Sequence, residues 1–167
     1  MIKNSLLAAS LLLLLVPAAH AEDALIEGNI QSKCIINTDV NGVYGNPSPS
    51  KLSTISTDGG VEPIIRFDVA VANFYLARIT TPTTFSTAPA LTDVVNWTGS
   101  TVTGEVSDAA MSAYDAAKVV YEATTEFDLT VAGSTWFKVS SVADYGFGRS
   151  FPGGTYRAVV QAECIAQ

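Results

Sequence analysis

Apolar and polar residues alternate along most of the chain with the two-residue period of β-strands. Between Leu25 and Ile36, for example, Ile26 and Ile30 fall on one face, while Glu27 and Asn29 fall on the other. Similar patterns predict strands over residues 64–72, 74–80, 119–123, 127–131, 136–142 and 155–166, two short strands within 94–106, and a short strand over 51–55. A turn at 132–134 predicts that 127–131 and 136–142 form a hairpin.

Turn-forming residues separate these segments. Residues 37–60 are rich in Asn, Asp, Gly, Pro and Ser, and Pro82 and Pro89 interrupt the chain further on. Residues 107–117 differ, because Ser107 and Asp108 can cap a helix that the following alanines favour. The pattern therefore predicts an all-β fold, a single β-sandwich of about seven strands with one short helix near 107–117.

The first 21 residues have the pattern of a secretory signal peptide. Lys3 precedes an almost wholly apolar stretch from Leu6 to Val16, and small residues at Ala19 and Ala21 fit signal peptidase cleavage. This stretch is shorter than the roughly 20 residues that a membrane span needs. We predict that residues 1–21 are removed, that residues 22–167 form one domain, and that the protein is exported to the periplasm, cell surface or extracellular space without spanning the membrane.

Composition excludes several function classes. The chain has 9 Lys and Arg against 16 Asp and Glu, a net charge of −7, so its surface repels nucleic acids. The one histidine, His20, lies within the predicted signal peptide, so the mature chain lacks the usual general base and zinc ligand. We expect no enzyme, no catalytic residues, no metal site and no cofactor. A glycosidase would need only two carboxylates, but no pair stands out among the scattered acids.

Cys34 and Cys164 are the only cysteines, and one lies near each end of the predicted domain. An exported protein meets oxidising conditions, which favour a disulfide between them. The alternative, a reactive thiol, has no nearby histidine to activate it. The bridge would place the first and last strands side by side or facing across the core.

Four aromatic residues suggest a binding function. Trp97, Trp136, Tyr145 and Phe147 could form the stacking platform that carbohydrate sites on β-sandwiches need, although each could instead lie in the core. Asn96 begins an N-glycosylation triplet, and the sequence does not decide whether the triplet is ever used.

The C-terminal segment resembles the terminal motif of pilus subunits assembled by the chaperone-usher route, including the spore coat protein U type. Gly154 is fourteenth from the end of the sequence, and Tyr156, Ala158, Val160 and Ala162 alternate after it. The resemblance implies an immunoglobulin-like fold completed by a strand from a neighbour, with like subunits or a periplasmic chaperone as partners by strand addition.

Two hypotheses of function follow. The first is a secreted structural or assembly protein of the cell surface, such as a pilus or fimbrial fibre subunit or an accessory component. The alternative is an extracellular module that binds carbohydrate or protein through the aromatic residues named above.

Overall fold

A computed structural model describes residues 33–106, 117–146 and 148–167, all within the compact unit Gln31–Gln167. These residues form two antiparallel sheets that pack as a sandwich, which confirms the predicted all-β fold class. Of the predicted helix near 107–117, only residue 117 is among the described residues. The predicted strand segment 25–32 lies wholly outside them.

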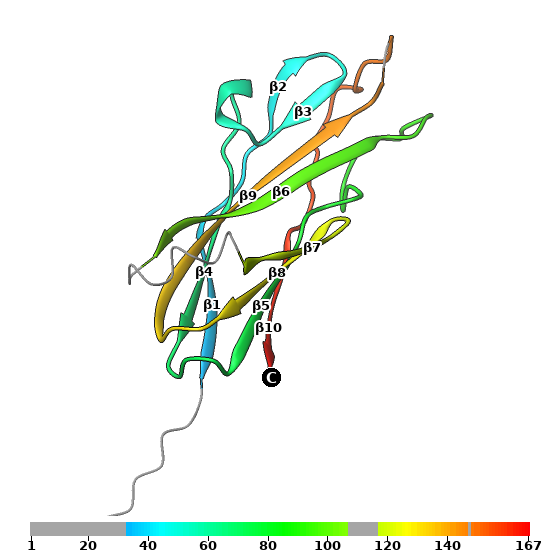
Figure 1. Ribbon diagram of the computed structural model, residues 1–167. Coiled ribbons are helices and arrows are strands. Elements are labelled where there is room, and N and C mark those ends of the chain that lie inside the picture. The colour runs from blue at the N-terminus through cyan, green and yellow to red at the C-terminus, as the bar shows by residue number, and fades with distance from the viewer. Residues whose placement is uncertain (1–32, 107–116, 147) are drawn as a thin grey trace, which may run out of the picture. The chain divides into compact units, whose positions relative to one another are not determined.

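The first sheet is built around one long strand, β9, which has neighbours along both edges (Figure 1). On one edge β9 pairs with β4 and then with β3, and on the other it pairs with β6. β1 pairs with β4 at the margin of this sheet, and β2 pairs with β3. The strands are β1 (Cys34–Val40), β2 (Gly45–Ser48), β3 (Lys51–Ser53), β4 (Ile64–Val69), β6 (Asn96–Val106) and β9 (Gly133–Asp144).

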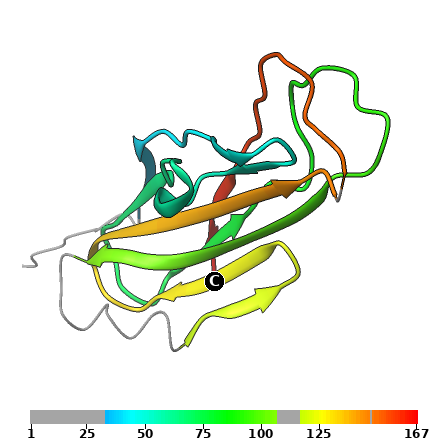
Figure 2. The same cartoon turned by 90° about the horizontal axis from the view of Figure 1, so that it is seen from above.

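The second sheet has the order β10-β5-β8-β7. Its strands are β5 (Tyr75–Thr80), β7 (Val119–Tyr121), β8 (Thr124–Leu129) and β10 (Gln161–Ala166), and a short 3-10 helix, η1 (Ser56–Asp58), lies between β3 and β4. Figure 2 shows β9 and β6 side by side in one layer and β7 with β8 in the other.

The core lies between the sheets and is formed by alternate residues of four strands. Phe137 of β9 contacts Phe67 of β4 and Phe127 of β8, with ring centroids 5.5 and 4.4 Å apart. All three rings are fully buried. The strand alternation therefore arises because one face of each sheet packs into this core while the other meets water. The remaining core residues are Ile65, Val69, Ala77, Ile79, Leu129 and Val139.

Two corners between the sheets explain where the predicted strand connections differ from the structure. The predicted hairpin of 127–131 with 136–142 is wrong, because β8 pairs with β5 and β7 while β9 belongs to the other sheet. At the other corner, Asn73 has a φ of 56° and turns the chain from β4 into β5. Alternation reports which face is buried but does not say which strand lies alongside, so it could not distinguish a hairpin from a corner.

The structure divides the described residues into ten strands, against about seven expected. Three of them, β2, β3 and β7, have only three or four residues each. In contrast, the two short strands predicted within 94–106 are one strand, β6, with a register shift between Thr103 and Glu105. Gly99 does not break this strand. It stands where β6 passes close to β9, because a Cβ at this position would lie 2.6 Å from the carbonyl oxygen of Ser140.

Candidate functional site

A disulfide joins the outermost strands of the two sheets on one side of the sandwich. The Cys34–Cys164 bridge links β1 to β10, and the two Cα atoms are 6.5 Å apart. Both cysteines are partly buried against the core. The predicted bridge is therefore confirmed, and it fits a protein of an oxidising compartment.

Both bridged strands have one edge that no strand of the described residues pairs with. β1 has only β4 as a partner, and β10 has only β5. The amide of Gln167 donates to the carbonyl of Phe74 at 3.0 Å, which marks the odd-numbered residues of β10 as those bonded to β5. The N–H and C=O groups of Ala162, Cys164 and Ala166 therefore point away from β5, along the unpaired edge.

A groove lies next to these two edges on one side of the bridge, between Thr38 of β1 and the segment 158–160 that precedes β10. A cavity of about 270 Å³ lies between Thr38 of β1 and Ala158 and Val160, which precede β10. A second cavity of about 550 Å³ shares Gly42, Tyr44, Ala158 and Val159 with the first and extends to Gly154. The second cavity is in the size range of ligand pockets, roughly 300 to 1,000 Å³. We call these two adjoining cavities together the β1/β10 groove.

The groove is uncharged along most of its length. Arg157 is the one residue among its lining residues that is charged at neutral pH, and it lies toward the Gly154 end. Ile36 of β1 pairs with the buried Phe67 and so faces inward, yet 36% of its surface is exposed because no described residue covers that margin of the sheet. Val159 in the groove wall is 59% exposed. Exposed apolar side chains beside unpaired strand edges are the usual requirement for strand addition.

Paired hydroxyl groups form the groove floor. The hydroxyls of Tyr44 and Ser141 lie 2.9 Å apart, and the amide of Ser141 donates to Thr54 Oγ1 at 2.9 Å. Burial raises the pKa of Tyr44, and its hydrogen bond to Ser141 partly offsets that rise. The floor is therefore polar, neutral at physiological pH and internally satisfied, so an occupant need not supply charge to pair with it.

An aromatic cluster closes the Gly154 end of the groove. Phe85 is its centre, with ring centroids 4.6 Å from Trp97, 5.1 Å from Tyr156 and 6.3 Å from Tyr44. Phe151 stacks on Tyr145 at 5.1 Å and contacts Phe85 at 6.0 Å. This cluster ties the loop around 81–95 to Tyr145 and to the segment 148–157. The loop and the segment 148–157 run close together in Figure 2.

Two of the four predicted aromatics belong to this cluster, and there they serve packing. Tyr145 is only 4% exposed, and its hydroxyl accepts a hydrogen bond from the amide of Thr92 at 2.8 Å. Hydrogen bonds from Thr92 lower the pKa of Tyr145. Trp97 is half-buried against Phe85 and also lines a separate cavity of about 410 Å³. Phe147 lies outside the described residues.

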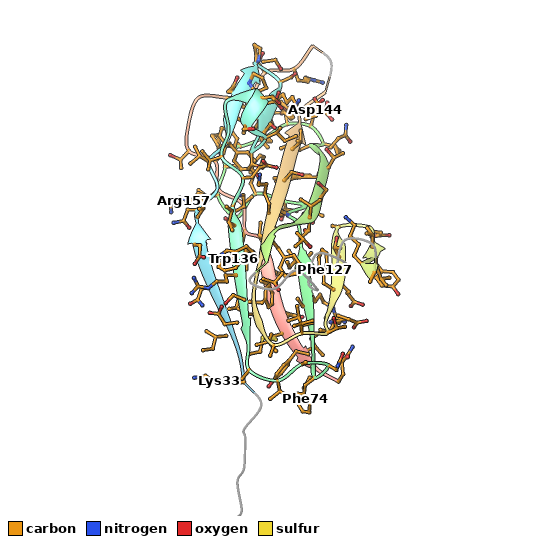
Figure 3. The ribbon with its side chains drawn as sticks, turned by 60° about the vertical axis from the view of Figure 1, so that its left-hand side comes forward. Lys33, Phe74, Phe127, Trp136, Asp144 and Arg157 are labelled. Carbon is orange, nitrogen blue, oxygen red and sulfur yellow. A yellow bond between two sulfur atoms is a disulfide. The ribbon has the colours of Figure 1, made fainter. Side chains whose placement is uncertain are left out.

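Trp136 lies apart from the other predicted aromatics. It is on the outer face of β9, nine residues before Tyr145, which corresponds to roughly 30 Å of extended strand. Figure 3 shows Trp136 well apart from Asp144, which ends that strand. Its Nε1 donates to Asp39 Oδ2 at 2.7 Å, and the guanidinium of Arg66 lies 5.9 Å from its ring centre. The structure therefore does not join all four predicted residues into one platform.

Sequence reasoning missed Phe85, Phe151, Thr38 and the groove itself. Phe85 lies between two prolines in a segment without periodicity, so no pattern marks it as structural. Gly154, which the terminal motif singled out, has a local physical reason, because a Cβ there would lie 2.5 Å from Pro89 Cγ. It lets the segment pass close to the proline ring at the end of the groove.

Neither a metal-binding cluster nor a membrane-spanning helix is present among the described residues. No three His, Cys, Asp or Glu side chains in that part of the chain are grouped so that they could hold a metal ion. Within the described ranges, no helix has the length and apolar character to cross a bilayer. Asn96 is exposed at the start of β6.

Comparisons with known proteins provide no relative. No protein-family model matches the chain, and neither curated proteins nor solved structures yield a match.

Proposed function

We propose that this protein is an exported structural subunit that joins copies of itself by strand addition in the β1/β10 groove. The occupant is the segment Glu22–Lys33 of a second copy. The observation that carries the proposal is the pair of unpaired strand edges that border an uncharged, partly apolar groove. The resemblance of the C-terminal segment to chaperone-usher subunits supports it, and a chaperone strand would use the same groove before assembly.

The segment Glu22–Lys33 has the side chains that such a groove accepts. Ile26, Gly28 and Ile30 share one face of an extended strand, and none of them is charged. Glu27 and Asn29 fall on the opposite face, where they would meet water. The whole segment precedes β1, which begins at Cys34. Strand addition of this kind combines backbone hydrogen bonds with side chains in alternate pockets.

Self-association of the full chain tests the proposal. The chain is expressed into an oxidising periplasm and examined by analytical ultracentrifugation from about 1 to 100 µM, the range in which modest interfaces associate. We expect multimers that grow with concentration. Ala158→Phe fills the groove at a half-buried position that lines both cavities, so it should reduce association at least tenfold. Ala132→Phe, in the exposed turn after β8, is the matched control and should associate normally.

A labelled peptide of the sequence Glu22–Lys33 provides a second measurement. It should bind the full chain and bind Ala158→Phe poorly, whereas a peptide with Ile26 and Ile30 replaced by Asp should not bind. A chain that stays monomeric at every concentration and binds no peptide would show that the domain is self-complete, and the proposal would then be wrong.

Carbohydrate binding is a second candidate, favoured by one observation. Trp97 lines the 410 Å³ cavity together with Thr81, Thr83 and Glu122, and this combination of an aromatic ring, hydroxyls and a carboxylate suits a sugar. A glycan array should then show binding that Trp97→Ala abolishes and Trp136→Ala, on the outer face of β9, preserves. An array without any binding would exclude this candidate.

A further inference from the structure

We propose that the Cys34–Cys164 bridge is an end stop, which limits a strand inserted in the β1/β10 groove to the level of residues 154–160. This inference rests on the proposed function and specifies how much of the donor strand each subunit accepts. It assigns to the disulfide a role in assembly in addition to its effect on stability.

The distance across the bridge carries the argument. A strand inserted between β1 and β10 must lie one strand spacing from each, so the two flanking strands must be about 9.5 Å apart. At the bridge their Cα atoms are only 6.5 Å apart. No strand can therefore lie between them at that level, and the covalent bond prevents them from separating. Beyond the bridge, the unpaired groups of Ala166 are cut off from the groove.

On the other side of the bridge the two edges leave open space. β1 and β10 run in opposite directions (Figure 1), so Thr38 lies near Val160, and both line the smaller cavity. Further along, Gly42 and Ala158 line both cavities. The larger cavity continues from these residues to Gly154, where the groove ends.

The length of this open part sets how much of a donor strand can pair. Residues 154–160 number seven, and seven residues span at most about 23 Å when fully extended. The donor segment Glu22–Lys33 has twelve residues, so about five of them must remain outside the groove. The donor's Lys33 is joined to its own folded body and must leave at the open end. Its first residues therefore point toward the bridge, where the stop acts.

A series of peptides tests the stop through the length dependence of binding. Fluorescent peptides Ile26–Ser32 and Glu22–Ser32 are titrated against the full chain and against the Cys34→Ser/Cys164→Ser double variant. With the bridge intact, the four added residues should change the affinity less than twofold. Without the bridge, they should pair with the newly accessible edge and bind about tenfold tighter.

Equal gains from the longer peptide in both proteins would overturn the end stop. If neither peptide binds the full chain or the double variant, the result would contradict the proposed function instead, so the two failures are distinguishable. A version of the longer peptide in which Asp replaces Ile26 and Ile30 is the control for non-specific binding.

Amide hydrogen exchange on the bridged chain keeps the inference testable if the double variant does not fold. Peptide binding should protect the amides of Ala158 and Val160, two residues that line the groove. The amides of Cys164 and Ala166, at and beyond the bridge, should exchange as fast as in the free protein. Protection that extends to Cys164 and Ala166 would show that the donor passes the bridge and would refute the stop.

Discussion

The two edges of β10 predict losses of stability of different size when proline is introduced, depending on which edge loses an N–H group. Glu163 is opposite Arg78, and the alternation of bonds places its N–H toward β5. Ala162 is opposite Ile79, and its N–H points to the edge without a partner among the described residues. Glu163→Pro removes a ladder hydrogen bond, whereas Ala162→Pro removes none.

The expected difference in stability follows from these bonds. Glu163→Pro should lower the free energy of unfolding by about 3 kcal/mol, because it combines a lost hydrogen bond with a clash of the proline ring against the ladder. Ala162→Pro should cost about 1 kcal/mol or less, since proline is tolerated at a strand edge that faces outward. Glu163→Ala controls for the side chain. Its contact with Arg78, at 3.7 Å on the surface, should contribute almost nothing.

Urea unfolding at low protein concentration measures the difference. With a slope of about 2 kcal/mol per M, the midpoint of Glu163→Pro should lie about 1 M below that of Ala162→Pro. Equal midpoints, or a lower midpoint for Ala162→Pro, would show that the outer edge of β10 is already paired. The reasoning that leads to the β1/β10 groove would then fail.

Three further predictions concern the same fold. Replacement of Cys34 and Cys164 by serine should lower the unfolding free energy by about 3 to 5 kcal/mol, because the bridge joins residues 130 apart in sequence; a loss below about 1 kcal/mol in a urea titration would contradict this. Thr101→Val should raise the melting temperature by about 3 °C, since the Thr101 hydroxyl is buried without a hydrogen-bond partner among the described residues; an unchanged or lower value in calorimetry would count against it. Burial raises the pKa of Tyr44 above its usual value near 10, so folding favours its protonated form; this stabilisation is present below pH 10 and is lost as the pH rises through the higher folded-state pKa. Above pH 10 the wild type should therefore lose stability faster than Tyr44→Phe, and parallel pH profiles would exclude this contribution of Tyr44.

Local patterns in the sequence were sufficient for the strands that carry the core. Phe67, Phe127 and Phe137 each lie in an alternating segment, because a strand with one buried face must place apolar residues at every second position. The disulfide could also be predicted, since the two cysteines of a chain with a predicted export signal have only one possible pairing. The predicted core depends on the pattern within a few consecutive residues, and the predicted disulfide depends on the fact that two cysteines can pair in only one way.

Partners between strands, in contrast, were decided only by tertiary structure. Nothing in the alternation of 127–131 and 136–142 distinguishes a hairpin from the corner that sends β8 and β9 into different sheets. The groove is also a tertiary feature, because Thr38 and Val160 come together only when β1 and β10 lie at the same margin of the sandwich. A sequence reports which side chains avoid water, but the edge that stays unpaired depends on which strands meet, and those contacts form between residues more than a hundred positions apart.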